Sequence, residues 1–201
     1  GAGPAGIFSA LELVDKTELS LLMLEKGPDI NQRRCPANRG LGCINCDPCS
    51  LLSGWGGAGA FSDGKLTLST EVGGWLNEYC TKEKLSELVN YVDSVYLKFG
   101  APDHLYGADP DKIEEIDRKA SLAGLKLIPQ KIRHMGTEKC AQTLRKMRRR
   151  LKDKADIRTR TEVKSLLVKK GRVEGVETTK GEKIYGKYVI VAPGRSGAEW
   201  W

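Results

Sequence analysis

The chain has 201 residues, of which 40% are apolar, and its 33 basic and 26 acidic residues give a formal net charge of +7. A chain of this length can bury one core of ordinary size with a smaller lobe. The sequence contains no run of about 18 apolar residues and no basic region followed by an apolar stretch at its start. It therefore predicts neither a membrane span nor a signal peptide, and the expected location is the cytoplasm. The modest positive charge suits a polyanionic cofactor as well as nucleic acid.

The chain opens with GAGPAG, a Gly-x-Gly-x-x-Gly motif. Apolar residues at helical spacing follow and predict a helix of about ten residues. The apolar run over 19–27 then predicts a buried strand. In a dinucleotide-binding βαβ unit, the three glycines allow a tight turn, a close approach to the pyrophosphate and close helix–strand packing. Glu25, 19 residues after Gly6, has the position of the acid that binds the adenosine ribose.

The alternative to a dinucleotide-binding unit is a glycine-rich loop that only starts a helix. The first strand of such a unit is missing, so we expect a segment of a longer polypeptide.

The region from 28 to 75 is irregular and contains four cysteines within fifteen positions, Cys35, Cys43, Cys46 and Cys49. Two of the gaps are Cys-x-x-Cys, a spacing that lets two thiolates reach one zinc ion or iron–sulfur cluster. The alternatives are reduced thiols or a redox pair. A disulfide framework is not expected, because a chain of this size does not need one.

In the stretch GWGGAGAFSDGKL, residues 54–66, five glycines fall within the eleven residues from Gly54 to Gly64. Glycine at this density is tolerated where a ligand touches the main chain, so it predicts a second phosphate or flavin contact. Gly59 and Gly64 with Lys65 nearly complete a P-loop. Leu66 replaces the serine or threonine that would hold magnesium, and no apolar strand precedes the motif, so a nucleotide triphosphatase is not predicted.

Three helices are predicted next: one capped by Thr81 and ended by Gly100, one over 110–123, and one after Thr137. Cys140, Leu144, Met147 and Leu151 mark the inner face of the third helix. The basic run RKMRRRLKDK, residues 145–154, falls on this helix with its charges between the apolar positions. It indicates a solvated face, because a nucleic-acid interface would need aromatic stacking groups or a recognised module nearby.

His134 lies just before the third helix, where it can face a ligand or satisfy a loop carbonyl. The last region, 161–197, predicts antiparallel strands with turns at 170–171 and 180–181. It is followed by a buried strand over 188–192 (YVIVA), ending in small residues that let the chain cross close to a cofactor.

Together, GAGPAG, LEKG, the Arg pair, the TEV segment and VIVAPGRSG resemble the flavoproteins of the glutathione reductase type, which have two dinucleotide-binding domains. More narrowly, GWGGAGAFSDGKL with IRHMGT is similar to a group of bacterial and archaeal FAD-dependent dehydrogenases. The resemblance implies an α/β fold: a Rossmann-like FAD/NAD(P)-binding domain with a parallel sheet, an inserted helical region and an antiparallel β-meander, truncated at both ends. We expect domain boundaries at 1–80 (FAD-binding half with the Gly/Cys-rich loop), 81–156 (helical insertion) and 157–201 (meander and return strand).

The resemblance also implies a role for each matching residue. By this resemblance, the pyrophosphate would be held by Gly1, Gly3 and Gly6 in the turn that also contains Pro4 and Ala5, and the ribose by Glu25, with Lys26 next to it as a further cofactor-binding candidate. Arg33 or Arg34 would serve the phosphate or adenosine side, and Val163 the adenine through its backbone. Gly57, Ala58 and Gly59 would lie near the flavin, and the chain would cross close to the cofactor at Ala192, Pro193 and Gly194.

The expected function is that of an FAD-dependent oxidoreductase in which the flavin accepts a hydride from a small-molecule substrate or from NAD(P)H. Lys65 and His134 are the candidates for tuning the flavin by charge. Two alternatives stay open: a flavoprotein electron carrier with a metal or iron–sulfur site at residues 35–49, and an RNA-associated flavoprotein. The substrate, the electron donor and the oligomeric state are not indicated.

Overall fold

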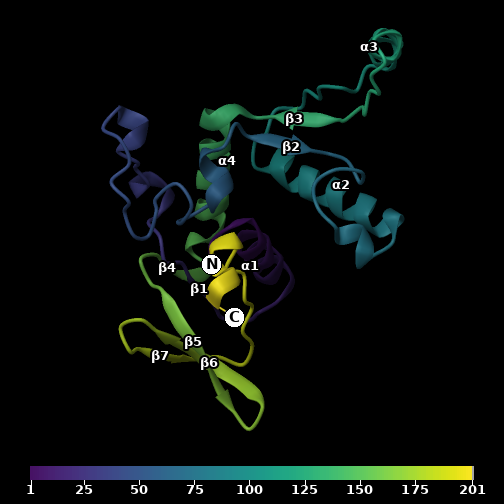
Figure 1. Ribbon diagram of the computed structural model, residues 1–201. Helices are drawn as coiled ribbons and strands as arrows, with labels where there is room; N and C mark the ends of the chain where they lie inside the picture. The colour runs from purple at the N-terminus through teal and green to yellow at the C-terminus, as the bar shows by residue number, and fades with distance from the viewer. Residues whose placement is uncertain (201) are drawn as a thin grey trace. The chain divides into compact units, whose positions relative to one another are not determined.

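The computed structural model describes residues 1–200, which form a mixed α/β structure with a small parallel sheet and antiparallel sheets (Figure 1). The helices and strands of this described part are α1 (Pro4–Lys16), β1 (Leu21–Leu24), β2 (Lys65–Thr67), α2 (Lys82–Lys98), α3 (Pro110–Leu122), β3 (Ile132–His134), α4 (Gly136–Lys152), β4 (Ala155–Arg158), β5 (Val163–Lys169), β6 (Arg172–Thr178) and β7 (Lys183–Tyr185). The chain divides into two compact units, residues 1–61 with 144–201 and residues 62–143.

In the first unit, β1 and β4 pair in parallel, with Leu21 opposite Ala155 and Leu24 opposite Arg158. Helix α1 contacts β1, and its residues Ile7, Ala10 and Leu11 are buried, as is Met23 of the strand. The predicted helix is confirmed, and so is a strand within 19–27, although it spans only Leu21–Leu24 and Met23 is its one buried residue. Strand β4 was not predicted, because its four residues include two charged ones and give no apolar run.

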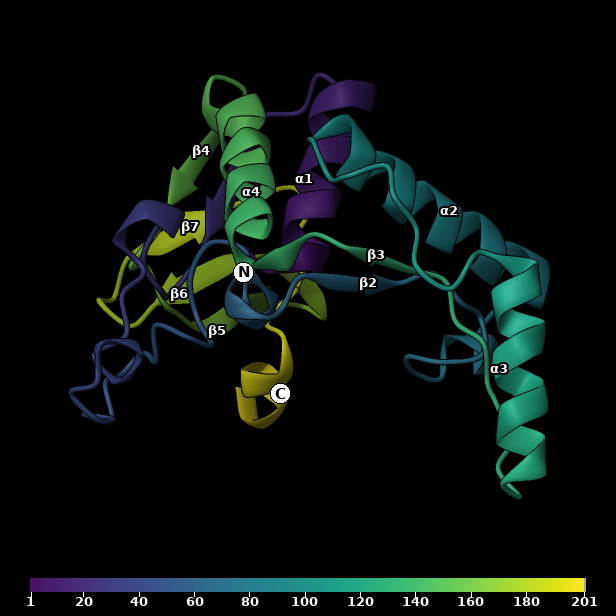
Figure 2. The same ribbon diagram turned by 90° about the horizontal axis from the view of Figure 1, so that it is seen from above.

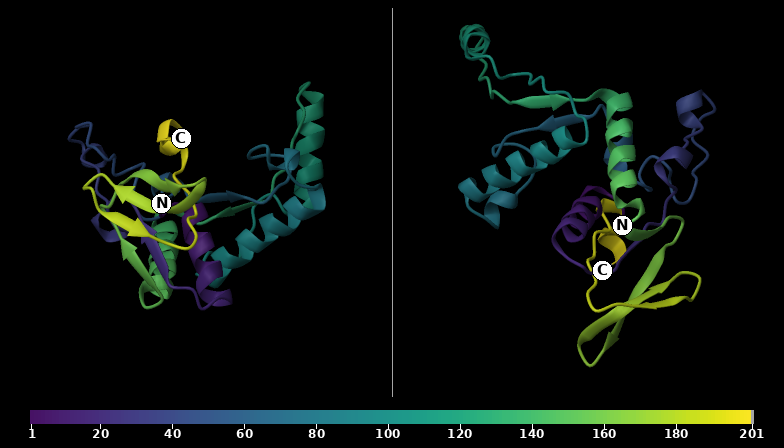
Figure 3. Two further views of the ribbon diagram at one scale, coloured as in Figure 1. Left: turned by 90° about the horizontal axis from the view of Figure 1, so that it is seen from below. Right: turned by 180° about the vertical axis from the view of Figure 1, so that it is seen from behind.

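The antiparallel sheet of the first unit has the strand order β5-β6-β7. The right-hand view of Figure 3 shows this sheet. The predicted turns at 170–171 and 180–181 are confirmed, and Gly171 and Gly181 adopt φ angles of 75° and 82° there. Residues 188–192, however, form no strand, and Tyr188 and Ile190 are 68% and 57% exposed. This prediction was wrong. A strand needs a neighbour to pair its backbone, and no described strand pairs with this run.

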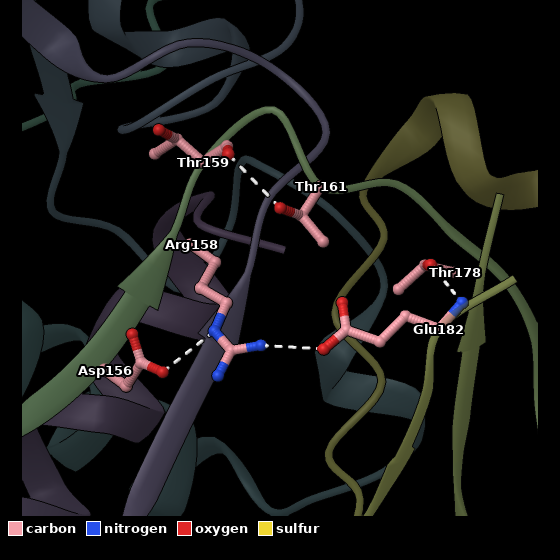
Figure 4. Close-up of polar contacts among 6 residues, drawn as sticks. All are labelled: Asp156, Arg158, Thr159, Thr161, Thr178 and Glu182. Carbon is pink, nitrogen blue, oxygen red and sulfur yellow. Dashed lines mark hydrogen bonds and ion pairs between the residues drawn. The ribbon is translucent and has the colours of Figure 1, made fainter. Parts of the chain in front are cut away.

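Polar contacts join the end of β4 to the hairpin of β6 and β7 (Figure 4). The Arg158 guanidinium donates to Asp156 over 2.8 Å and to Glu182 over 3.1 Å. Thr178, which is 2% exposed, accepts a hydrogen bond from the Glu182 amide through its hydroxyl. The Arg158–Glu182 bond connects the antiparallel sheet to the edge of the parallel pair.

Three arginines on the charged face of α4 bond to the first 61 residues, while Lys146, Arg149 and Lys152 are exposed, as expected of a solvated face. Arg145 donates to Asn31, Arg148 pairs with Asp29 over 3.1 Å, and Arg150 pairs with Asp15. The predicted inner face of the helix is confirmed, since Cys140, Leu144, Met147 and Leu151 are all buried.

In the second unit, β2 and β3 form a short antiparallel pair, seen side by side in Figure 2. Helix α2 begins after Thr81, whose hydroxyl accepts from the Lys84 amide, as predicted. The 3% exposed Arg133 of β3 holds this helix by donating to Asp93 and to the Pro102 carbonyl. Helix α3 has no buried residue and stands apart from β2, β3 and α2 in Figure 1.

No helix in the part of the chain that the structure describes is long and apolar enough to cross a membrane.

Candidate dinucleotide site

The glycine turn, residues 1–6, leads directly into α1. Gly3 is the N-cap residue with extended backbone, Pro4 opens the helix, and the first turn contains no acidic residue. The first helical hydrogen bond runs from the Ile7 amide to the Gly3 carbonyl over 2.9 Å, so the amides of Ala5 and Gly6 precede the ladder. Together with the helix dipole, such amides favour an anion at this end of the helix.

The three motif glycines differ in what surrounds them. A Cβ on Gly1 would lie 2.3 Å from the Ala192 carbonyl oxygen, and one on Gly6 would lie 1.9 Å from the Gly1 carbonyl oxygen. A Cβ on Gly3 would meet nothing nearer than the Gly57 Cα at 3.9 Å. Packing within the chain therefore requires glycine at positions 1 and 6. At position 3 the backbone faces space that a ligand can enter, which fits a pyrophosphate approaching the second glycine of the motif.

Glu25 lies where the predicted strand ends, at the carboxyl edge of β1 and β4. Its amide donates to the Arg158 carbonyl, and its carbonyl accepts from the Thr161 amide. The side chain is 7% exposed. In a parallel sheet this edge is where ligands bind, so the position agrees with the predicted ribose side of the site.

The Glu25 carboxylate accepts three backbone hydrogen bonds. Oε2 accepts from the Ala2 amide over 2.7 Å, and Oε1 accepts from the amides of Gly27 and Gly54, each over 2.8 Å. A carboxylate offers about four acceptor positions, so these three bonds leave one position on Oε2 unused within residues 1–200. The sequence gives no signal for the three amide bonds, which span up to 29 residues.

The second glycine loop, residues 53–59, lies against the glycine turn. The Gly56 amide donates to the Ala2 carbonyl over 2.8 Å. Gly57 has a φ of 62°, and a Cβ on it would lie 3.1 Å from the Gly3 Cα. Trp55 is fully buried, and its indole donates to the Leu144 carbonyl over 3.0 Å. The glycine density predicted a ligand contact here, but nothing in the sequence indicated the anchoring role of Trp55.

The Arg33 side chain donates hydrogen bonds to four backbone carbonyls, two just before the second glycine loop and two within it. Its guanidinium donates to Ser50, Leu51, Trp55 and Gly57 over 2.7–2.9 Å. The residue is 4% exposed. Burial lowers the pKa of Arg33 to about 10, and the nearby Glu25 carboxylate opposes this shift.

The other predicted cofactor residues vary in their surroundings. Ala192 lies against the glycine turn, as its contact with the Gly1 position shows. Lys26 is half-buried, and Arg34 is exposed. The Val163 carbonyl, assigned to the adenine by resemblance, accepts from the Trp200 indole over 3.1 Å. The remaining residues of this set are exposed or half-buried: Ala58, Gly59, Pro193 and Gly194.

Lys65 and His134, both predicted to act near the flavin, are cross-strand partners in β2 and β3 of the second unit. Both are exposed, and Lys65 pairs with Asp63 over 2.8 Å. The hydrogen bond from Lys65, with the charge of His134, lowers the pKa of Asp63. The Tyr106 ring lies 4.6 Å from the His104 ring and 6.2 Å from the His134 ring, so both histidines of the chain lie beside one tyrosine.

None of the four cysteines predicted as metal ligands forms a disulfide within residues 1–200: Cys43 is exposed, and Cys35, Cys46 and Cys49 are half-buried. Within residues 1–200, no three His, Cys, Asp or Glu side chains are grouped so that they could hold a metal ion. A site built on these cysteines therefore stays a prediction and would need a rearrangement of the loop.

Thiol labelling separates Cys43 from Cys140. Cys140 is 6% exposed, and burial raises its pKa, so its thiolate is scarce at mildly alkaline pH. We expect iodoacetamide to modify Cys43 at least about tenfold faster than Cys140, because the thiolate is the nucleophile. Mass spectrometry of time points measures both rates in one sample. Equal rates in the folded protein would contradict the burial of Cys140.

No family model matches the chain. An uncharacterized protein of Clostridium beijerinckii is 25% identical over 202 residues, which cover 99% of this chain and 31% of that protein. The chain thus spans about a third of the length of this curated relative. Among solved structures, L-amino acid deaminase from Proteus myxofaciens in complex with anthranilate has a TM-score of 0.43 at 15% identity, covering 90% of this chain and 41% of that one. L-amino acid deaminase from Proteus vulgaris has a TM-score of 0.42 at 15% identity, covering 90% and 43%. At these TM-scores neither likeness assigns a function to this chain.

Proposed function

We propose that this chain is part of a flavin-dependent oxidoreductase and that its glycine turn holds the pyrophosphate of FAD. The observation that carries the proposal is the contrast among the three glycines: positions 1 and 6 are closed by backbone, whereas Gly3 faces open space at the start of α1. A glycine that packing does not require, placed at a helix N-terminus, is what a bound phosphate needs. The sequence resemblance implies FAD as the dinucleotide.

The residues of the first unit divide the work of binding. Ala5 and Gly6 would present their amides to the pyrophosphate, and the remaining acceptor position of Glu25 would take a ribose hydroxyl. Gly57 would form the wall of the site next to Gly3. When bound, FAD would supply hydride acceptance from a substrate or a nicotinamide.

We further propose, from the sequence resemblance, that Lys65 and His134 tune the flavin by charge; the two residues are cross-strand partners in β2 and β3. We expect Lys65→Met and His134→Gln each to lower turnover roughly 10- to 100-fold, within the range of acid–base and charge effects. Flavin content should stay at the wild-type level. Unchanged turnover by both variants would remove them from the mechanism.

The proposed cofactor is tested on the native protein, purified without air. We expect a yellow protein with a flavin absorption band, and one FAD per chain released on denaturation. Metal analysis of the same sample decides whether residues 35–49 also hold zinc or iron. A colourless protein that takes up no FAD on dialysis against it would overturn the proposal.

A further inference from the structure

We propose that Glu25 and Arg33 form a clasp that holds the second glycine loop against the glycine turn, and that FAD affinity depends on this clasp. The inference rests on the proposed function and gives Glu25 a positioning role in addition to its ribose contact, and Arg33 a positioning role alone. It assigns Arg33 no direct contact with the cofactor.

The Glu25 side of the clasp joins three segments through one carboxylate. The Ala2 amide belongs to the glycine turn, the Gly27 amide to the segment after β1, and the Gly54 amide to the second glycine loop. All three donor–acceptor distances lie between 2.7 and 2.8 Å, and the carboxylate is buried. Because charge-assisted hydrogen bonds are about twice as strong as neutral ones, a single side chain fixes the spacing of the three segments.

The Arg33 side fixes the same loop through its carbonyls. Its Nη1 donates to both Trp55 and Gly57, while Nε and Nη2 donate to Ser50 and Leu51. None of the ion pairs found among residues 1–200 involves Arg33, so carbonyls rather than a carboxylate contact its charge directly. A planar guanidinium can bond to several carbonyls at fixed angles, which an ammonium cannot do.

The clasp affects the cofactor site because the second glycine loop contacts the glycine turn. Gly56 bonds to the Ala2 carbonyl, and Gly57 packs on Gly3 at the N-cap of α1. Gly54 itself is enclosed, since a Cβ there would lie 2.5 Å from the Pro28 carbonyl oxygen. Loss of either clasp residue would release the wall beside Gly3. Only a fraction of the molecules would then hold the loop in the FAD-binding position, and the apparent affinity for FAD would fall by that fraction.

The decisive variant is Arg33→Lys, which keeps the charge, and its matched control is Arg34→Lys at the exposed neighbour. In the FAD-free protein we expect peptides covering 50–57 to exchange amide hydrogen faster in Arg33→Lys than in wild type. The dissociation constant for FAD should rise at least about tenfold, because only the molecules with the loop in place bind FAD. At saturating FAD, the visible circular dichroism of the flavin should also change. Arg34→Lys should match wild type in all three measurements.

Two further variants keep the test decisive. Glu25→Gln replaces an acceptor oxygen by a donor and should speed exchange at 50–57 in the same way. Arg33→Ala should recover part of its FAD affinity when millimolar methylguanidinium is added, because the added cation can occupy the vacated site.

Weaker FAD binding by Arg33→Lys with unchanged exchange in the FAD-free protein would overturn the clasp, because Arg33 would then contact the cofactor directly. Unchanged exchange and unchanged affinity would overturn it as well. Failure of the proposed function is distinguishable, since the wild-type protein would then bind no FAD while the exchange comparison still reports on the clasp.

Discussion

Gly3→Ala should leave the FAD-free protein folded while raising its dissociation constant for FAD roughly 100-fold, or about 2.7 kcal/mol. The new methyl group would meet only the Gly57 Cα, at 3.9 Å, and the φ of −76° at Gly3 is open to alanine. Alanine is a poorer N-cap than glycine, but this costs less than about 1 kcal/mol. The affinity loss arises because the methyl group would occupy the space that the pyrophosphate needs. Titration of flavin fluorescence gives the affinity, and thermal unfolding of the FAD-free protein gives the stability.

Gly6→Ala is the matched comparison, since it adds the same methyl group at a position closed by the chain. There the Cβ would lie 1.9 Å from the Gly1 carbonyl oxygen. We expect it to lower the free energy of unfolding of the FAD-free protein by about 3 kcal/mol, as overpacking does. Equal stability of the two variants, or equal FAD affinity of Gly3→Ala and wild type, would contradict the assignment of the open side of Gly3 to a ligand.

Asp93→Asn should destabilise the second unit by about 3 kcal/mol, because it leaves a buried guanidinium without its carboxylate. Arg133 is 3% exposed, and two of its nitrogens bond to the two oxygens of Asp93. The hydrogen bond that Arg133 donates to Asp93 raises the pKa of Arg133. A guanidinium is protonated across the usual pH range even without a carboxylate partner, so the variant buries an unpaired charge. Urea unfolding followed by circular dichroism measures the loss.

Asp103→Asn is the control, since Asp103 also interacts with Arg133 through its charge but is exposed. Its effect should be within about 0.5 kcal/mol of zero, as for most surface substitutions. If both variants unfolded at the same urea concentration as wild type, the Arg133–Asp93 pair would not be what attaches α2 to β3.

Local patterns in the sequence predict the elements whose hydrogen bonds are local. The helix after GAGPAG, the Thr81 cap and the turns at 170–171 and 180–181 depend on neighbouring residues, and the structure has all of them. The strand expected over 188–192 fails for the opposite reason. Its apolar residues predict burial, but burial depends on which strands lie beside it.

The site shows the same division. The positions of Gly3 and Glu25 at the ends of their elements follow from the motif and its spacing. The bonds from Glu25 to Gly54 and from Arg33 to Gly57 join residues 29 and 24 positions apart, so no local pattern carries them. The pairing of Lys65 with His134 crosses an even longer stretch, and β2 and β3 have only three residues each.

The most direct test of the account is a structure of the native protein solved with FAD bound. We expect pyrophosphate oxygens within about 3 Å of the Ala5 and Gly6 amide nitrogens, the normal length of such a hydrogen bond, with the ribose beside Glu25. Density for FAD elsewhere, with the glycine turn contacting only protein, would contradict the central claim.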